Sequence, residues 1–519
     1  MQSSNPDIKP KGKVWTYVVI IIVIVAIISG GLIYYYSTLQ HPAKQETISI
    51  AAPVYGSSTQ AWEDFINNAT QSWQAAHPNV TIKFVGPSGA SSEGQYYTKL
   101  DLLTSSSSTA PSIMLEDMFY TATYQHEGIL APLNSYVNSS VFSNVFPSAL
   151  GQMTINGTHY GLPTQVTDTL IYYNITLLQE AHVISSSNTT WQPTNWTQII
   201  DAAQTVNSTL VPTDSGLIPL NIYEGVKADE ASTFTGFEGL LYGTGSGLYN
   251  FTDHKWTGYS NGLNQTFSFY KTVFGKGLAT SALSSTPYVT TGEYLQQGKL
   301  AIAIDGSWMY GYQWAPGAQH PINNFTKYIG VAMIPTSNGQ APGFNTMVGG
   351  WGWAMYNGTP SSEKPLVASF MTALDNTSNQ ILINEPGQAL AGGLPTAKNA
   401  VNNTNFGKLM PTAPSLDTFY TKILQYGSYR PPVAAYPTVS SVLQTVMGYI
   451  VSDHYSVSHA ATTYNSMLTS AVGGTNVVAT TPYTPDFSIN SHDTGNNQFN
   501  YMSNLYSDVS LSLLSYVLW

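Results

Sequence analysis

The sequence predicts an α/β fold with at least two lobes, preceded by a membrane-spanning helix. A length of 519 residues exceeds what one hydrophobic core usually serves. Strand-like and helix-like segments alternate along the chain, which is typical of largely parallel sheets. Residues 14–36 are an uncharged, largely apolar run. As a helix this run is roughly 34 Å long at about 1.5 Å per residue, which is enough to cross a bilayer.

The composition excludes several classes of protein. Zero cysteine removes disulfides, thiolate catalysis and cysteine-based zinc sites. The chain has only 17 Lys and Arg residues against 28 Asp and Glu residues. It therefore lacks the excess of basic residues that is typical of nucleic-acid-binding proteins. Charged residues make up 9% of the chain, against about 25% in ordinary soluble domains. The 43% hydrophobic fraction still suffices for a core, so something other than charge must keep the surface soluble.

The N-terminal segment predicts a single-pass membrane anchor with the bulk of the chain outside the cell. Lys9, Lys11 and Lys13 precede the apolar run and no cation follows it directly. Residues 11–14 loosely resemble the archaeal prepilin-type signal, although the lysine after Gly12 departs from that pattern. A cleaved secretory signal is the competing interpretation, but the run is too long for one. We expect a cytoplasmic or leader segment at 1–13, the anchor at 14–36 and a linker at 37–46.

Many Asn-x-Ser/Thr sequons support the outside location, because such sites mark exposed loops of exported chains. Asn174 is the weakest match, since it sits at a probable strand end. Absent cysteine, sparse charge and many sequons together indicate an extracellular archaeal glycoprotein. They favour an acidic habitat, where carboxylates lose their charge. The candidate glycosylation sites are Asn68, Asn79, Asn138, Asn156, Asn188, Asn195, Asn207, Asn250, Asn264, Asn324, Asn357, Asn376 and Asn402.

Each predicted element has its own local signal, such as the helical spacing of Trp62, Phe65 and Trp73. No fixed-period repeat is present, so a solenoid or propeller is excluded. The apolar segment at 505–519 is too short for a confident span, and we expect it to pack on the body. The expected strands are 47–53, 80–85, 112–115, 169–173, 217–222, 300–304, 328–333 and 352–356; the expected helices are 58–76, 97–103, 196–206, 262–273, 365–375 and 438–451.

The motifs of common enzymes are missing. There is no G-x-S-x-G elbow, no H-E-x-x-H and no phosphate-binding G-x-x-x-x-G-K-[ST]. The adjacent acids 116–117 and 229–230 do not demonstrate the facing pair that a glycosidase needs. We therefore expect neither an enzyme nor a metal or cofactor site.

Tryptophans beside turn glycines point to a ligand site instead. Trp308 follows Gly306-Ser, and Trp351 follows Gly349-Gly. A Trp on a tight turn at a strand end projects into a crevice, where α/β proteins bind ligands. Flat aromatic faces suit sugar rings, and Asp, Glu, Asn and Arg suit their hydroxyls. Trp353 follows the alternation of its own strand and is expected in the core.

Six motifs in order resemble the solute-binding protein family 1, the extracellular sugar receptors of ABC importers. The resemblance covers residues 47–450 approximately. The motifs are APSIMLED at 110–117 with EGILAPL at 127–133, NGTHYGLP at 156–163 with LIYYN at 170–174, PTNW at 193–196, LQQGKLAIAIDGSW at 295–308, GGWG at 349–352 and GLPT at 393–396.

This resemblance implies a type II periplasmic-binding-protein-like fold, in which hinge strands join two lobes around the sugar. It implies lobe 1 at 47–162 and 331–375, and lobe 2 at 163–330 and 376–450. Residues 451–519 remain as a C-terminal extension. The crossings are expected near 160–168, 329–335 and 375–379.

The resemblance also assigns roles to individual residues. Asp117 matches an acid that binds sugar hydroxyls, Trp308 matches the stacking Trp, and Trp351 follows the glycines that approach the ligand. Further ligand contacts are expected on the first crossing, before the late helix and at two strand ends. These further residues are Thr167, Asp168, Arg430, Tyr436, Tyr55 and Glu224.

The implied function is a membrane-tethered, monomeric receptor that delivers a sugar to an ABC permease. Archaeal receptors with prepilin-type signals typically take glucose, arabinose or trehalose, and we favour glucose. A surface or filament protein is the main alternative, because the N-terminal helix resembles pilin anchors. A glycoside hydrolase is the weaker one.

Overall fold

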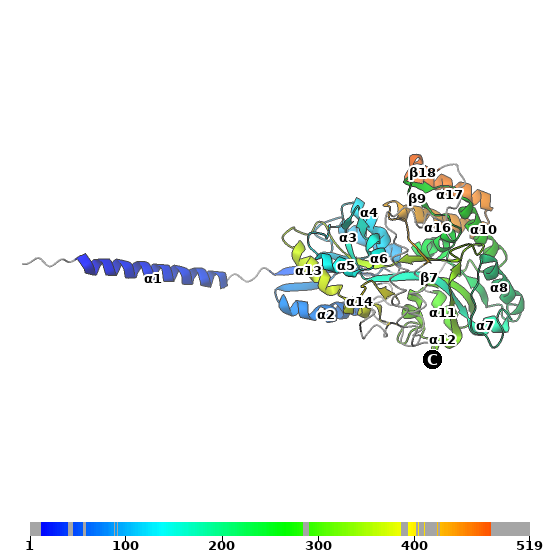
Figure 1. Cartoon of the computed structure of the whole chain (residues 1–519), viewed down its shortest axis with the longest axis horizontal. Coiled ribbons are helices and arrows are strands. Elements are labelled where there is room, and N and C mark those ends of the chain that lie inside the picture. Colours follow the sequence, from blue (N-terminus) through cyan, green and yellow to red (C-terminus); the bar gives the residue numbers. More distant parts are fainter. Residues whose placement is uncertain are drawn as a thin grey trace, which may run out of the picture.

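The computed structural model places a long N-terminal helix apart from a body of two lobes (Figure 1). Helix α1 (Gly12–Leu39) has 28 residues, about 42 Å at about 1.5 Å per residue. Its described side chains, Trp15 and residues 17–32, are all exposed. Over the described residues, no helix meets the length and apolarity of a membrane span. The structure describes residues 12–39, 45–54, 59–87, 89–90, 92–283, 290–385, 393–400, 403, 409, 423 and 426–478.

The first sheet is the framework of lobe 1, and its strands run in the order β2-β1-β3-β15-β6. Strands β1, β2 and β3 are parallel, β15 joins β3 antiparallel from a distant segment, and β6 pairs antiparallel with β15 and so runs in the direction of the first three strands. The predicted strands at 47–53, 80–85, 112–115 and 352–356 correspond to four of the five. The bounds are β1 (Glu46–Ala51), β2 (Val80–Phe84), β3 (Ile113–Asp117), β6 (Gly161–Pro163) and β15 (Trp351–Met355).

The core of lobe 1 lies between this sheet and the helices on its faces. Trp62 of α2 stacks on Phe84 and meets the edge of Trp353, and Trp353 is fully buried as predicted. Helix α14 lies at the junction between the lobes, where Gln380 donates to Pro163 O. The helices and the hairpin are α2 (Thr59–Ala76), α3 (Glu93–Thr104), α4 (Thr121–His126), α5 (Ser139–Asn144), α6 (Pro147–Gln152), β4 (Thr154–Ile155), β5 (Thr158–His159), α13 (Lys364–Leu374) and α14 (Thr377–Asn384).

The second sheet is the framework of lobe 2, and its central path is β13-β14-β7-β11-β8. Strand β7 is buried along all ten residues and also pairs with β12 and β16. The strands are β7 (Gln165–Asn174), β8 (Ile218–Asn221), β11 (Leu300–Gly306), β12 (Ile329–Ala332), β13 (Ile334–Pro335), β14 (Phe344–Gly349), β16 (Leu394–Pro395) and β17 (Gly427–Ser428).

Helices of lobe 2 surround this sheet and include the described end of the chain. Helices α16 and α17 pack on each other and on α10, so residues 451–478 belong with lobe 2. The predicted segment 505–519 lies outside the described residues. The helices are α7 (Ile175–Glu180), α8 (Trp196–Thr209), α9 (Gly239–Gly243), α10 (Asn261–Gly275), α11 (Thr290–Gln296), α12 (Phe325–Tyr328), α16 (Tyr436–Val451) and α17 (Val457–Val472). A small sheet joins β9 (Tyr249–Asn250), β10 (Lys255–Thr257) and β18 (Val477–Val478).

Two neighbouring strand pairs carry the chain between the lobes. Strand β6 lies in the first sheet and β7 in the second, so the first crossing falls within the predicted range 160–168. The second crossing differs from the prediction. Strands β12 and β13, at the predicted range 329–335, both lie in the second sheet, and the chain crosses at Gly350 between β14 and β15. The strands within residues 331–349, which were expected in lobe 1, therefore belong to the second sheet.

Gly350 is required at this crossing by a close backbone approach. Its φ is 154°, and a Cβ there would lie 1.9 Å from Gln165 O. The two crossings are also hydrogen-bonded to each other, because Thr164 N donates to Trp351 O at 2.9 Å. Glycine at this position lets the two crossing strands lie side by side.

Candidate ligand-binding cleft

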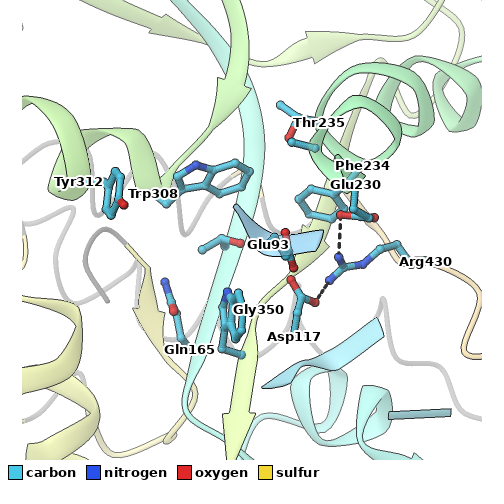
Figure 2. Close-up of a pocket in the computed structure, with 13 residues that line it drawn as sticks. Glu93, Asp117, Gln165, Glu230, Phe234, Thr235, Trp308, Tyr312, Gly350 and Arg430 are labelled. Atoms are coloured by element: carbon cyan, nitrogen blue, oxygen red, sulfur yellow. Dashed lines mark hydrogen bonds and ion pairs between the residues drawn. The ribbon is translucent and has the colours of Figure 1, made fainter. Parts of the chain in front are cut away.

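A cavity lies between the two lobes, beside the crossing strands (Figure 2). It encloses about 90 Å³, room for roughly three waters at about 30 Å³ each. Ligand pockets more commonly measure about 300–1,000 Å³. The structure therefore describes a closed conformation, in which side chains of the two lobes fill most of the cleft. The lining residues are Glu93, Asp117, Gln165, Thr167, Glu230, Ala231, Phe234, Thr235, Trp308, Tyr312, Gly350, Trp351 and Arg430.

Strand ends of lobe 1 supply one wall of the cavity. Asp117 ends β3, where its Oδ1 accepts from Phe119 N at 3.3 Å and caps the next turn. Trp351 begins β15 directly opposite Asp117 in the sheet register. Glu93 is the first residue of α3, which Ser92 caps by accepting from Gln95 N. These residues all stand where a strand or helix starts or ends, so their side chains reach the junction.

Two π-helical segments of lobe 2 supply much of the opposite wall. Phe234 and Thr235 belong to η3 (Ser232–Glu238), and Tyr312 belongs to η5 (Tyr310–Trp314). Single π-helical turns are rare and are frequent at functional sites. Their presence on this wall marks it as more than a packing surface.

Each lobe presents one half-buried tryptophan to the cavity. Trp308 of lobe 2 stacks with Phe234, with 6.2 Å between ring centroids. Trp351 of lobe 1 is nearly parallel to Tyr97, with 6.4 Å between centroids. The Trp308 ring lies against Gly306, where a Cβ would approach it to 2.0 Å. Aromatic side chains combine a flat apolar face with a polar edge, so these two rings suit a ring-shaped polar ligand.

Arg430 links the lobes at one end of the cavity. The residue is 4% exposed and lies in lobe 2, between β17 and α16. Its Nη2 is 2.5 Å from Asp117 Oδ1 in lobe 1, and its Nη1 is 3.2 Å from Glu230 Oε2 in lobe 2. The guanidinium carbon also lies 4.6 Å from the Phe119 ring and 4.5 Å from the Phe234 ring. One side chain thus contacts an acid and an aromatic ring from each lobe.

The surrounding ion pairs keep this guanidinium charged. Burial acts to lower the pKa of Arg430, but Asp117 and Glu230 more than offset that effect. Burial raises the pKa of Asp117, and the Arg430 charge opposes the rise. Burial likewise raises the pKa of Glu230 to about 7, again against the effect of Arg430. The bridge is therefore a buried ion pair whose acid partners are costly to ionise without it.

A tyrosine and a second acid extend the network behind Glu230. The Tyr436 hydroxyl lies 2.7 Å from Glu230 Oε1 and 2.9 Å from Glu238 Oε2. One hydroxyl donates only one proton, so one of the two carboxyls must be protonated and donate to the tyrosine oxygen. Burial raises the pKa of Glu238 well above its usual value, with Glu230 as the next cause. Glu238 is thus the protonated partner, and Tyr436 donates to Glu230.

Five of the sequence-predicted site residues line the cavity: Asp117, Thr167, Trp308, Trp351 and Arg430. Tyr436 lies behind it and acts through Glu230. Tyr55 lies outside the described residues.

Asp168 and Glu224 are not among the cavity lining, contrary to the prediction. Gln165 and Thr167 line the cavity, and successive side chains of a strand point to opposite faces. The Asp168 side chain therefore points away from the cavity; the residue is 1% exposed, and its backbone N donates to Ser307 Oγ at 3.1 Å. Glu224 is 2% exposed and lies beyond the end of β8.

Sequence reasoning missed several lining residues, including Glu93, Gln165, Glu230 and Tyr312. The alternation along β7 could have identified Gln165 together with Thr167. The sequence showed the adjacent acids 229–230, but it did not decide between solvated loop acids and acceptors for sugar hydroxyls. Glu93 had no local signal, because only the approach of the lobes brings it to the cavity. Among the described residues, no group of three or more His, Asp or Glu side chains is placed to hold a metal ion.

Most sequon asparagines that the structure describes are exposed, whereas Asn174 is buried and caps α7 by accepting from Leu177 N. Asn402 lies outside the described residues. The exposed ones are Asn68, Asn79, Asn138, Asn156, Asn188, Asn324, Asn357 and Asn376; Asn195, Asn207, Asn250 and Asn264 are half-buried.

Two lobes joined by crossing strands around a lined cleft define a solute-binding protein. Residues 55–381 match the family model of the bacterial extracellular solute-binding proteins, and the chain belongs to that family. The family consists of binding proteins for transport and not of enzymes, in agreement with the prediction. A comparison with curated protein sequences finds no match.

Solved structures share the fold at low sequence identity. The GacH receptor of Streptomyces glaucescens, solved unliganded and with acarbose, has a TM-score of 0.65 at 18% identity, covering 82% of this chain and 98% of its own. Maltose-bound T. maritima MalE3 has a TM-score of 0.66 at 16% identity, covering 82% and 100%. A Thermotoga lettingae solute-binding protein with α-D-tagatose has a TM-score of 0.63 at 19% identity, covering 82% and 100%.

Proposed function

We propose that the protein is an extracellular sugar receptor that closes its two lobes around the ligand. The observation that carries this proposal is the pair of half-buried tryptophans, one from each lobe, that face the same cavity. A ring bound between Trp308 and Trp351 would contact both lobes. Such a ligand stabilises the closed state over the open one, and that change distinguishes the loaded receptor from the empty one.

Polar groups without partners add to this support. Gln165 is 3% exposed and Thr235 is fully buried. Gln165 Oε1, Thr235 Oγ1 and Trp308 Nε1 make no hydrogen bond with any described residue. Buried polar atoms are normally satisfied, and each one left unpaired costs about 1–3 kcal/mol. Sugar hydroxyls both donate and accept, so one ligand of that class could satisfy all three atoms.

The sugar class also agrees with the structural neighbours, whose printed ligands are acarbose, maltose and tagatose. Within that class we favour glucose or a similar mono- or small oligosaccharide. The loaded receptor would deliver it to the permease subunits of an ABC importer. Lobe 1 would consist of the segments around the first sheet and lobe 2 of those around the second.

We further propose that α1 tethers an archaeal, glycosylated body to the outer face of the cell membrane. The helix is 28 residues long and apolar side chains cover its described surface on all sides. A helix that is apolar all round needs an apolar surrounding, and it lies apart from the body (Figure 1). Deleting residues 1–39 should release the protein from membranes. Retention in the membrane fraction after that deletion contradicts the tether.

Calorimetry of the full-length chain with glucose, galactose, arabinose, maltose and trehalose tests the ligand class. At least one sugar should bind, and Trp308→Ala should weaken that binding. If no sugar of the panel binds, the proposed ligand class is wrong. If a sugar binds equally well to Trp308→Ala, the cavity described here is not its site.

A further inference from the structure

Among the residues that line the cleft, three are acidic and one is basic. Of the 28 acids in the chain, Glu93, Asp117 and Glu230 line the cavity, and Asp229 and Glu238 lie beside it. Arg430 is the only Lys or Arg among the lining residues. We propose that the cleft selects its ligand by charge: it admits neutral sugars, binds more tightly those that carry an ammonium group, and rejects those that carry a carboxylate or phosphate. This inference rests on the proposed function.

The one cation of the cleft is already occupied by the chain's own acids. Its two terminal nitrogens bind Asp117 and Glu230 (Figure 2), and its guanidinium carbon lies 4.6 Å from the Phe119 ring and 4.5 Å from the Phe234 ring. An anionic ligand would have to displace a carboxylate from Arg430 and then lie beside the carboxylates it displaced. Like charges brought together at a binding interface oppose binding. The two carboxylates therefore oppose an anion at the terminal nitrogens of the guanidinium, and only its Nε makes no hydrogen bond with a described residue.

Glu93 is the acid of the cavity lining that has a buried carboxylate oxygen without a hydrogen bond to a described residue. Its Oε1 is buried and makes no hydrogen bond with any described residue. Figure 2 shows its carboxyl beside that of Asp117, at the lobe junction. Burial raises the pKa of Glu93 well above its usual value, and Asp117 and Glu230 raise it further, whereas Arg430 lowers it. The surroundings of this carboxyl therefore favour its neutral form.

An ammonium group bound next to Glu93 would change that state. An opposite charge within about 4–6 Å favours the ionised carboxyl, so binding should release the Glu93 proton and form a new ion pair. The remaining acid near Glu93 is Asp229, whose Oδ2 accepts from Gly94 N at 3.3 Å. Asp229 is thus already engaged with α3, which leaves Glu93 as the group that receives the ligand cation.

A matched series of hexoses tests the proposal by calorimetry of the full-length chain at pH 6. Glucose, glucosamine and glucuronate differ in one group, which is neutral, cationic or anionic. We expect glucosamine to bind several-fold more tightly than glucose, and glucuronate at least tenfold more weakly. Glucosamine binding should release a proton, seen as a binding enthalpy that depends on the buffer. Glucose binding should not.

Two isosteric variants separate Glu93 from the general charge of the protein. Glu93→Gln should abolish both the glucosamine preference and the proton release while glucose still binds. Glu180→Gln removes an exposed acid at the end of α7, far from the lining, and should leave all three affinities unchanged. Equal affinities for glucose and glucuronate in the wild-type chain would overturn the proposal while leaving the sugar-receptor function intact.

A ligand-free measurement decides the case in which none of the three hexoses binds. Trp308 faces the cavity, so the difference in fluorescence between wild type and Trp308→Phe isolates its emission. The quenching by the caesium cation and by the iodide anion is each divided by the quenching by neutral acrylamide. In a negative cleft, this ratio should be larger for caesium than for iodide. Glu93→Gln should not reverse this order, because Asp117 and Glu230 remain. Equal quenching by caesium and iodide would overturn the charge selection.

Discussion

Arg430 Nη2 lies 2.5 Å from Asp117 Oδ1, so a side chain of lobe 2 forms an ion pair with the end of a lobe 1 strand. The resemblance to sugar receptors implies that Asp117 binds ligand hydroxyls. In the described closed conformation its Oδ1 instead accepts from Arg430 and from Phe119 N. The ion pair therefore stabilises lobe closure in a cleft with space for only a few waters.

The first prediction concerns this bridge. Arg430→Gln should shift the ligand-free protein toward an open conformation, because it leaves Asp117 and Glu230 without their cation. Removing one partner of a buried ion pair costs about 3–5 kcal/mol. Small-angle X-ray scattering of the full-length chain without ligand should show a larger radius of gyration.

Lys83→Gln is the control for the bridge, since it removes an exposed cation from β2 and should leave the scattering unchanged. Asp117→Asn should shift the conformation in the same direction as Arg430→Gln. The double variant should add little to either single change, because the two residues share one interaction. Unchanged scattering in both single variants would show that the bridge does not hold the lobes.

The second prediction concerns the aromatic wall. Trp308→Ala removes a flat ring from the cavity and should weaken sugar binding about 30-fold, since central aromatic contacts commonly contribute about 2 kcal/mol or more. Trp191→Ala is the control, because Trp191 is also half-buried but packs on Tyr173 away from the cleft. Calorimetry with the best-bound sugar measures both. An equal loss in the two variants would point to general destabilisation.

The third prediction concerns stability against pH. Burial raises the pKa of Glu116 to about 8, partly opposed by the Thr121 hydroxyl at 2.9 Å and increased by Asp117. The carboxyl is neutral in the fold and ionises near pH 4.5 when unfolded. The contribution of the Glu116 carboxyl to the free energy of unfolding is therefore fully present below about pH 4.5, and it is lost as the pH rises through about 8.

The free energy of unfolding should consequently be higher at pH 5 than at pH 8. Burial also raises the pKa values of Asp305 and Glu230 to about 7, which contributes in the same direction. Denaturant unfolding at both pH values measures the difference. Glu116→Gln mimics the neutral carboxyl, so this variant should show a smaller difference in the free energy of unfolding between the two pH values. A wild-type protein more stable at pH 8 than at pH 5 would contradict this account.

The fourth prediction concerns the second crossing. Gly350→Ala should destabilise the protein by more than about 1 kcal/mol, because its Cβ would overlap Gln165 O and the backbone has positive φ. Gly275→Ala is the matched control at the end of α10, where a Cβ meets nothing within 4 Å. Thermal unfolding compares the two. Equal stability of Gly350→Ala and wild type would show that the crossing can rearrange.

Local patterns in the sequence predicted most elements within a few residues. The spacing of Trp62, Phe65 and Trp73 predicted α2, and the apolar run at 80–85 predicted β2. The second crossing was misplaced, because β12 and β13 look like any buried strands and only their partners show which sheet they join. The local signal for this crossing was the glycine pair Gly349-Gly350 before Trp351.

The sequence identified a cleft residue only where the residue type, together with a position at a strand end, indicates a role in ligand binding. Trp308 and Trp351 were found in this way. Glu93 was not, because it begins a helix and not a strand end, and Glu230 was not, because it becomes a neighbour of Asp117 only when the lobes close. The bridge to Arg430 joins positions more than 300 residues apart in the chain, and no local pattern encodes such a contact.

The hydrogen bond from Thr164 N to Trp351 O has a mechanical consequence for the receptor. It ties the two crossing strands into a short ribbon at the point where the lobes meet. A paired ribbon twists and bends readily, but sliding one strand past the other would break the pairing. The lobes can therefore rotate apart while the strands keep their register, so each closing motion returns Trp308 and Trp351 to the same relative position.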